Sequence, residues 1–397
     1  MASKWQIVKL GDICDKIGSG ATPKGGKDAY CSSGISLIRS QNVLDFAFSV
    51  DGLAHINDEQ ARKLNNVEVK SGDVLLNITG DSVARVCIVD DSHLPARVNQ
   101  HVAIVRGNAN KVISSYLLYF LQMEKPHLLQ LASAGATRNA LTKGMIEQLE
   151  LALPPLDVQR RMVTILDALQ QKIHTNNKIN DNLYEMVNAY YTSLFKDVEC
   201  EMTTIGNYAE RIYSGGTPTT SNATYWDGAF GWFSSGETRN RFVISTEKTI
   251  TQAGIDNSST KLAAKHDIVM ASAGQGFTRG QTSMLLIDTY VNQSVIVIHA
   301  DRNVLPYLFW NLANRYEELR AISDSSSIRG SLTTKMISAF EIPLANEESL
   351  QAFADFSWSV IPKIENNLLE NERLAVLRDS LLPKLMSGEI DVSDIQL

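Results

Sequence analysis

The stretch KLGDICDKIGSGATP (residues 9–23) returns in similar form as TTIGNYAERIYSGGTP (residues 203–218). Equivalent residues such as Gly11 and Gly206, or Pro23 and Pro218, lie 195 positions apart. Self-similarity at a fixed separation indicates an internal repeat. The chain is therefore predicted to contain the same folding unit twice.

Further matches extend the repeat along the chain. GDVLLNITG (72–80) matches HDIVMASAG (266–274), VNQHVAIV (98–105) matches VNQSVIVI (291–298), and LTKGMI (141–146) matches LTTKMI (332–337). Short apolar runs such as DVLLNI and VAIVR, separated by Gly, Asn, Asp and Ser, predict strands. Residues 114–131 and 305–322 each predict one helix. Each copy should thus be an α+β globule of about 150 residues.

A different pattern follows each globule. Residues 156–195 contain no Gly or Pro, and alternate steps of four and three from Met162 follow the apolar seam of a coiled coil. Such a helix is about 60 Å long. The same steps from Phe353 give a second, less regular seam, in which Pro362 and Pro383 predict a kink or a frayed end.

Both seams carry two asparagines at the same two places. If an internal two-fold axis relates the copies, the helices pair antiparallel, with Asn176 facing Asn371 and Asn180 facing Asn367. Buried asparagine pairs can fix the register of a coiled coil at some cost in stability. The alternative, that these side chains point to solvent, stays open.

The predicted fold class is α+β. It consists of two duplicated α/β globules, each followed by a long helix, with the two helices forming an antiparallel coiled coil of pseudo-two-fold symmetry. The predicted segments are a first globule (1–155), a central helix (156–198), a second globule (199–346), and a distal helix with its tail (347–397).

Composition narrows the class of protein. With 44% apolar and 20% charged residues the sequence is typical of a globular protein. No segment approaches eighteen consecutive apolar residues, so we expect a cytoplasmic protein without a membrane span. Four cysteines without a CxxC pair suit a reducing compartment and argue against structural zinc. The formal net charge of −7 is concentrated in the last fifty residues and leaves the partner undecided.

No catalytic constellation is found. The one Pro-Pro pair lies in LPPL (153–156), without the Asn/Asp-Pro-Pro-aromatic motif of a DNA-adenine methyltransferase. GSGATPKGG (18–26) lacks the spacing of a phosphate-binding loop, and the histidines show no zinc-binding spacing. The sequence predicts no catalytic residue, no metal site and no cofactor bound by this chain.

The whole chain resembles the specificity (S) subunit of type I restriction-modification systems. The resemblance rests on SGATP and SGGTP, on the closing segment GATRNALTKGMIEQLELALPPLDVQRRMV (135–163), on the mid-helix segments KIHTNNKINDNL (172–183) and KIENNLLENERL (363–374), and on LLPKLMSGEIDV (381–392). It implies that each globule is a target-recognition domain for one half of a split, asymmetric double-stranded DNA sequence. It further implies that the helices hold two methyltransferase (M) subunits, which bring S-adenosylmethionine, and that nuclease/translocase (R) subunits join for restriction.

Candidate DNA-binding residues are polar side chains able to reach base edges or phosphates. In the first globule they are Ser19, Thr22, Lys24, Arg39, Ser40, Gln41, Asn42, Thr79, Arg85 and Arg138. In the second globule they are Thr217, Ser234, Ser235, Glu237, Thr238, Arg239, Gln275, Arg279 and Arg329. The run 39–42 aligns with 234–237 and is polar but different, as two half-sites would require. A polar turn that only packs the fold is the open alternative, and for the identical VNQ segments we favour fold maintenance.

Two other readings remain. A specificity module of a type IIB-like restriction enzyme shares the recognition chemistry, whereas a coiled-coil scaffold with two protein-binding heads has no role in DNA. An autonomous enzyme has the least support, for want of a motif. Salt dependence separates DNA binding from a scaffold, because phosphate contacts make log affinity fall linearly with log salt.

Overall fold

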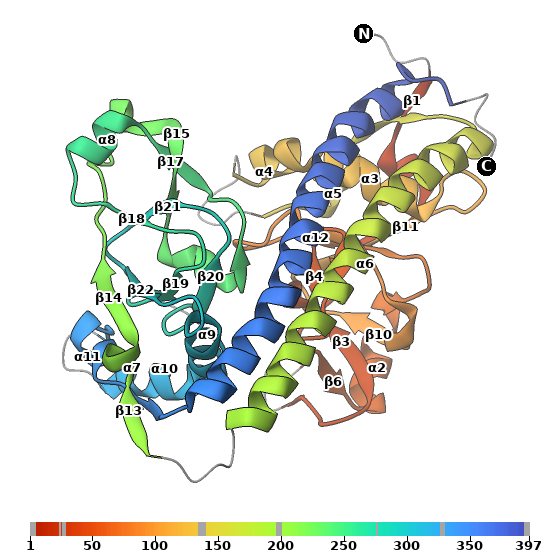
Figure 1. Cartoon of the computed structure of the whole chain (residues 1–397). Helices are drawn as coiled ribbons and strands as arrows, with labels where there is room; N and C mark the ends of the chain where they lie inside the picture. Colours follow the sequence, from red (N-terminus) through yellow and green to blue (C-terminus); the bar gives the residue numbers. More distant parts are fainter. Residues whose placement is uncertain are drawn as a thin grey trace. The chain divides into compact units, whose positions relative to one another are not determined.

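The computed structural model describes residues 5–23, 25, 29–133, 140–195, 201–274, 277–325 and 330–392. It divides into two compact units, Met1–His174 with Arg373–Leu397, and Thr175–Glu372. The long helices α6 (Leu156–Phe195) and α12 (Glu347–Ser387) each contribute to both units (Figure 1). Each unit therefore combines one globule with parts of both helices.

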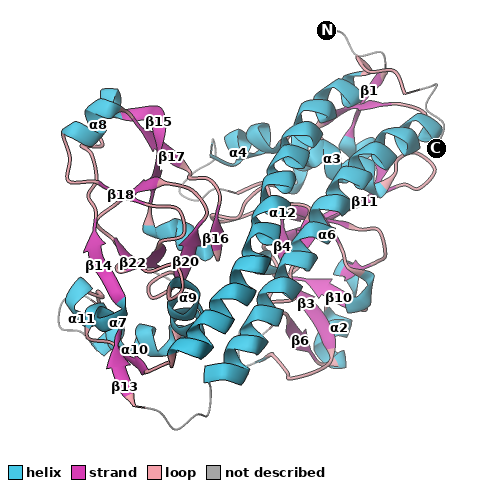
Figure 2. Cartoon of the chain, in the orientation of Figure 1, coloured by secondary structure: helices cyan, strands magenta, loops and turns pink. Residues whose placement is uncertain are grey.

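The first globule mixes short strands and helices (Figure 2). Its strands are β1 (Gln6–Lys9), β2 (Cys14–Ser19), β3 (Ile35–Ile38), β4 (Val43–Leu44), β5 (Ala47–Phe48), β6 (Ala54–Ile56), β7 (Glu68–Val69), β8 (Val74–Asn77), β9 (Val86–Ile88), β10 (Ala96–Val98), β11 (Val102–Gly107) and β12 (Glu150–Leu153). Its helices are α1 (Leu10–Ile13), α2 (Asp58–Lys63), α3 (Ser114–Met123), α4 (Lys125–Ser133) and α5 (Lys143–Glu147).

The second globule repeats this order of elements. Its strands are β13 (Met202–Thr204), β14 (Ala209–Ser214), β15 (Trp226–Phe233), β16 (Phe242–Val243), β17 (Lys248–Ile250), β18 (Lys261–Ala263), β19 (Ile268–Ala271), β20 (Thr282–Leu285), β21 (Thr289–Val291), β22 (Val295–Ala300) and β23 (Glu341–Pro343). Its helices are α7 (Ile205–Tyr208), α8 (Gln252–Asp256), α9 (Leu305–Asn314), α10 (Tyr316–Ser325) and α11 (Thr334–Ser338).

The sheets of the two globules correspond strand by strand. The order β2-β11-β8-β9 in the first globule returns as β14-β22-β19-β20 in the second, where β16 adds a further strand. The order β6-β3-β10-β7 returns as β17-β15-β21-β18, and the pairs β3–β10 and β15–β21 are both parallel. The duplication read from the sequence is thus a duplication of the fold.

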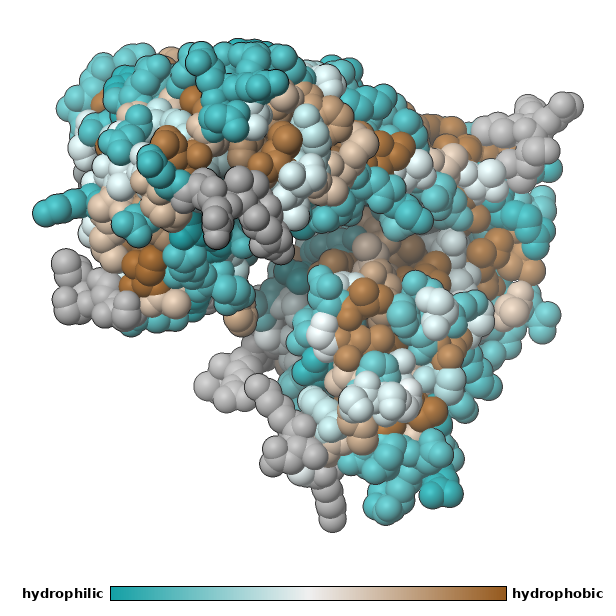
Figure 3. Space-filling model, turned by 60° about the horizontal axis from the view of Figure 1, so that its bottom comes forward, coloured by the Kyte–Doolittle hydropathy of each residue, from teal (hydrophilic) through white to brown (hydrophobic). Residues whose placement is uncertain are grey.

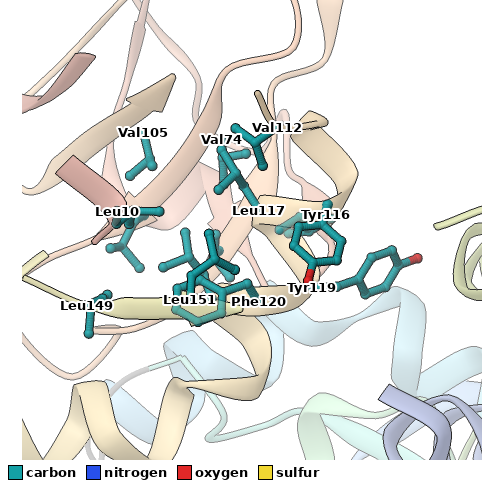
Figure 4. Close-up of a cluster of buried hydrophobic side chains, with 14 of the residues drawn as sticks. Leu10, Val74, Val105, Val112, Tyr116, Leu117, Tyr119, Phe120, Leu149 and Leu151 are labelled. Atoms are coloured by element: carbon teal, nitrogen blue, oxygen red, sulfur yellow. The ribbon is translucent and has the colours of Figure 1, made fainter. Parts of the chain in front are cut away.

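Alternate residues of a strand point to opposite faces of its sheet. In the sheet β2-β11-β8-β9 the residues on both faces are buried. Leu76 and Val105 pack with α3 and the long helices, whereas Leu75 and Ile104 pack against the second sheet. Figure 4 shows the former cluster, where Val74 and Val105 lie with Leu10 and with side chains of α3 and β12. This burial explains why DVLLNI and VAIVR are almost wholly apolar.

The two long helices pair antiparallel within each unit. In the first unit, Nη1 of Arg378 donates to Oε1 of Gln170 at 2.6 Å. In the second, Nδ2 of Asn176 donates to Oδ1 of Asn371 at 2.9 Å, and Asn367 donates to Asn180 at 2.7 Å. These are the asparagine partners expected from the seam, and together with the duplicated globules the pairing confirms the predicted fold class. A role of these pairs in setting the register stays a prediction.

Two sequence expectations need correction. Residues 114–131 and 305–322 do not form one helix each, since the chain turns at Glu124 between α3 and α4 and at Arg315 between α9 and α10. Pro126, which follows Glu124 closely, has no N–H to continue the helical ladder. The distal helix does not fray at its prolines, because α12 runs without interruption past both Pro362 and Pro383, while the expected kink stays a prediction.

Candidate nucleic-acid interface

In each globule the repeated loop, SGATP or SGGTP, packs its backbone closely against the backbone of the VNQ segment. We call this contact the junction. The N–H of Gly20 donates to the Asn99 carbonyl at 3.1 Å, and the N–H of Gly215 donates to the Asn292 carbonyl at 3.3 Å. A Cβ at Gly20 would lie 1.7 Å from the Val98 carbonyl oxygen, and one at Gly215 would lie 1.9 Å from its counterpart in the second globule. Only glycine permits this close approach, so the repeat of the loop follows from the shared fold.

Side chains repeat the same junction. The hydroxyl of Thr22 donates to Oε1 of Gln100, and that of Thr217 donates to Oε1 of Gln293. Asn99 is buried and accepts the His101 N–H at 3.0 Å, as its counterpart in the second globule accepts the Ser294 N–H at 2.9 Å. The identical VNQ segments therefore maintain the fold, and both candidate threonines are committed to it.

A surface hollow of about 380 Å³ lies beside this junction in the first globule. A short chain of contacts leads into it, with Gln100 Nε2 3.0 Å from His101 Nε2 and His101 Nδ1 2.5 Å from the Thr79 hydroxyl. The hollow is lined by Ser40, Gln41, Thr79, Gly80, Asp81, Ser82, Arg85 and His101. The fold thus brings together four candidate residues from two separate segments of the sequence, namely Ser40, Gln41, Thr79 and Arg85.

The lining combines groups that can bind base edges. Gln41 is exposed, and its amide nitrogen donates to the Asp51 carbonyl at 3.1 Å, which fixes the side chain and leaves Oε1 as an acceptor. Arg85 is half-buried, and within the described part of the chain its guanidinium makes no hydrogen bond or ion pair. Arginine and glutamine are the side chains that best discriminate guanine and adenine in the major groove.

Three candidates are buried supports instead. Asn42 is fully buried, accepts the Arg39 N–H at 3.0 Å and donates to the Ser49 carbonyl at 3.0 Å. Glu237 occupies the equivalent place and accepts the Ser234 N–H at 2.8 Å. Thr238 is buried as well. Different residues thus hold the same turn, and we leave these three out of the DNA-contact set because their side chains are enclosed.

Equivalent positions in the second globule carry different chemistry. The backbone pairing of Asn77 with Arg85 (2.9 Å) corresponds to that of Ala271 with Gln281 (3.1 Å), which aligns Arg85 with Gln281. By the same alignment of segments, the counterparts of Ser40, Gln41, Thr79 and His101 are Ser235, Gly236, Ala273 and Ser294. The supporting junction is common to both globules, whereas four of these five lining positions differ.

The remaining candidates fall outside this arrangement. Ser19 is exposed at the end of β2, and Ser234 is half-buried. Three arginines are held by their own globules: Arg39 donates to the Gly52 carbonyl, Arg239 pairs with Glu247, and Arg279 pairs with Asp324. Lys24, Arg138, Gln275 and Arg329 lie outside the described residues.

Sequence reasoning missed two residues of interest. His101 lines the hollow, and its place directly after the repeated VNQ segment, where the second globule has Ser294, was the available signal. Phe277 is 84% exposed in the loop between β19 and β20. The available signal was an aromatic residue beside glycines, in a loop that is two residues longer than its counterpart in the first globule.

The described His, Cys, Asp and Glu side chains can be checked for a metal site and for a reactive thiol. Among them no group of three or more His, Cys, Asp and Glu is placed to hold a metal ion. Burial raises the pKa of the Cys14 and Cys87 thiols to about 12, so neither is a thiolate nucleophile at neutral pH.

No described helix has the length and apolar character needed to cross a bilayer. On the face shown in Figure 3, hydrophobic residues form small groups among hydrophilic ones.

The two globules share one supporting junction and carry different residues at most positions that line the hollow of the first globule, as expected of a duplicated recognition protein. Comparison with known families agrees, since the model for the type I restriction modification DNA specificity domain matches residues 2–185 and 198–375. The chain belongs to this family and is a specificity subunit of the type I restriction-modification class, as predicted.

Individual relatives match all or part of the chain. The HindI specificity subunit of Haemophilus influenzae is 21% identical over 98% of this chain and 100% of its own length. The EcoR124I/EcoR124II specificity subunit of Escherichia coli is 24% identical over 62% of this chain and 63% of its own. A crystal structure of the S subunit from M. genitalium has a TM-score of 0.56 at 14% identity and covers 97% of this chain and 96% of that chain, which supports the fold.

Proposed function

We propose that the chain reads a bipartite, asymmetric double-stranded DNA target, with one half-site for each globule. The observation that carries this proposal is the common junction, beside which most of the positions that line the hollow of the first globule carry different residues in the second. A quasi-symmetric protein suits the near-symmetric DNA backbone, and divergent linings select different bases in each half. The proposed base-reading residues of the first globule are Ser40, Gln41, Thr79 and Arg85, joined by His101.

For the second globule we propose the corresponding region between β19 and β20 together with the turn that starts at Ser235. Gln281 and Ser294 supply amide and hydroxyl groups at the positions of Arg85 and His101. Exposed Phe277 supplies an apolar face of the kind that contacts a thymine methyl group or a base step. The two half-sites should therefore differ in sequence.

We further propose that the helices hold two methyltransferase subunits. Met186 on α6 and Leu377 on α12 occupy equivalent places, 191 positions apart, and each is 45% exposed. Because these apolar side chains stay exposed in this chain, they are available for contact with a protein partner. Equivalent apolar positions suit two copies of one partner. In this proposal S-adenosylmethionine and the methyl transfer belong to the M subunits, R subunits join for restriction, and the chain itself only recognises DNA.

The test is half-site discrimination by the complex of this chain with its M subunits. Gln41→Ala and Arg85→Ala should each relax the sequence requirement of one half-site, by about 1–3 kcal/mol per lost base contact, and leave the other half-site unchanged. Methylation of a library of bipartite duplexes measures both half-sites in one reaction. Arg62→Ala, which removes an exposed arginine of α2 outside the hollow, is the matched control.

Two outcomes would contradict the proposal. Equal loss at both half-sites would assign Gln41 and Arg85 to folding. Binding of the complex to DNA without the linear fall of log affinity with log salt would favour the scaffold reading, because phosphate contacts require that dependence.

A further inference from the structure

The hairpin of β4 and β5 begins directly after the turn that lines the hollow. At its tip Phe46 has φ +61°, a left-handed conformation that is strained for an aromatic residue. The Phe46 N–H donates to the Val86 carbonyl at 3.0 Å, and its ring lies 5.9 Å from the ring of Tyr119 on α3. The surroundings therefore hold this tip firmly in an unfavourable conformation.

The Phe46 ring also meets a buried arginine of the distal helix. The guanidinium carbon of Arg378 lies 4.0 Å from the ring centroid, a cation–π contact. Arg378 is 8% exposed, donates to Gln170 on α6 at 2.6 Å and pairs with Asp379 at 2.8 Å. A buried cation is retained only where such partners satisfy it. We call the turn and hairpin of residues 40–48 the reading segment of the first globule. Arg378 thus connects this reading segment to both long helices.

The second globule has the same kind of contact with its partners exchanged. Arg241 stands 195 positions after Phe46, and its guanidinium carbon lies 4.3 Å from the ring centroid of Tyr184 on α6. Its Nη1 is also 3.4 Å from a carboxylate oxygen of Asp181. In the first unit the globule supplies the ring and a helix supplies the cation, whereas in the second unit the globule supplies the cation and a helix supplies the ring.

We propose that Phe46–Arg378 and Arg241–Tyr184 are positioning contacts, which fix the orientation of each reading segment on its helix pair. Such contacts determine how sharply the protein selects the distance between half-sites, since a looser globule accommodates more than one distance. The proposal rests on the proposed function, because it assigns these residues to the placing of the same reading segments. In this proposal they act by placing the reading segments and do not touch DNA.

The test uses the complex with M subunits and a library of duplexes in which the spacer between half-sites varies. Phe46→Leu keeps the apolar bulk and removes the ring. It should lower methylation at the first half-site roughly tenfold in kcat/KM and broaden the range of accepted spacers, because a lost cation–π contact loosens the joint. Phe46→Tyr keeps the ring and should restore both. Arg241→Gln should produce the mirror-image loss at the second half-site.

The matched control is Phe48→Leu in the same hairpin, whose ring stacks on His93 at 5.5 Å within the globule. It should leave the spacer range unchanged. Equal losses at both half-sites, or an unchanged spacer range with Phe46→Leu and Arg241→Gln, would overturn the proposal. Arg241 is 53% exposed in its side chain, so its replacement keeps the test valid even if Phe46→Leu fails to fold. A wild-type complex that discriminates neither half-site would instead defeat the proposed function itself.

Discussion

His266 shows how a single position can differ between two copies of one fold. It has φ +79°, and the first globule has Gly72 with φ +78° at the equivalent place. A left-handed conformation suits glycine, although histidine adopts it more often than most residues. Here the ring packs on Trp358 of α12 at a centroid distance of 4.7 Å. The contact with the helix offsets the strain that glycine avoids.

This histidine should make stability depend on pH. Burial, together with the nearby charges of Lys265 and Arg302, lowers the pKa of His266 below its ordinary value of 6.5. The unfolded chain then binds a proton more readily than the folded chain. Stability is fully present above the ordinary pKa and is lost as pH falls from about 6.5 through the lowered pKa.

His266→Asn and His266→Gly both remove this titration, and both residues accept a left-handed backbone. In either variant the urea midpoint should fall less between pH 7.5 and pH 5.5 than in the wild type. The change in urea midpoint between the two pH values is compared between variant and wild type, so the contributions of the other histidines cancel. A pH dependence equal to that of the wild type in both variants would contradict the assignment.

Some site residues could be chosen from the sequence because the two copies could be compared. Ser40, Gln41 and Arg85 are polar residues at positions where the repeat pattern predicts neither a core residue nor a glycine. The structure places all three in one hollow. Asn42 and Glu237 looked equally suitable. A single sequence cannot show that their side chains turn inward to hold a backbone turn, because this depends on the hydrogen bonds of the folded loop.

At the level of elements, the asparagine pairs of the long helices predict that single and double replacements change the free energy of unfolding in opposite directions. Asn367 is buried and donates to Asn180 at 2.7 Å. Asn367→Leu alone should lower the free energy of unfolding by about 1–3 kcal/mol, since it leaves Asn180 without this partner. Replacing both by leucine should restore stability or raise it, because a well-packed apolar pair carries no desolvation cost.

Denaturant midpoints of the two single variants and the double variant measure this coupling. Asn366→Leu, at an exposed position of the same helix, is the control. Additive losses in the double variant would contradict the pairing. The spacer preference of the double variant also tests the register, since a changed preference assigns the register to these pairs and an unchanged one assigns it to the packing of the globules.

The sequence predicted elements better than their ends. The central helix was evident from forty residues without Gly or Pro, the distal helix from its matching seam, and the strands from short apolar runs. The break of the helix after α3 was missed, because Pro126 is also compatible with the first turn of a helix and only the packing of Phe120 and Leu128 in one core shows that the chain turns there.

At the level of the whole molecule, the helix pair should act as a ruler. One heptad added to α6 between Leu169 and Ile173, with a second between Leu374 and Arg378, should lengthen the pair by about 10 Å. That length corresponds to about three base pairs of duplex DNA. The second heptad belongs opposite the first, because Gln170 and Arg378 are bonded. A position 191 residues after the first would lie elsewhere along the antiparallel pair.

Both half-site sequences should persist in this variant while the preferred spacer grows, and a library of spacers is needed because three base pairs also rotate the second half-site by about 100° around the duplex. A four-residue addition to each helix is the control, since it turns the apolar stripe away from its partner. An unchanged spacer preference in a folded complex with M subunits would show that the coiled coil does not set the distance.

The first unit consists of two segments that lie far apart in the chain, and this affects when it can fold during synthesis. That unit needs residues 373–397, and Leu382 and Leu385 belong to the same hydrophobic cluster as Leu10. During synthesis this cluster can close only after Leu385 has been made, whereas the second unit, residues 175–372, is one unbroken stretch and is complete earlier. A stop codon before residue 373 should thus weaken the packing of the globule that contains Leu10.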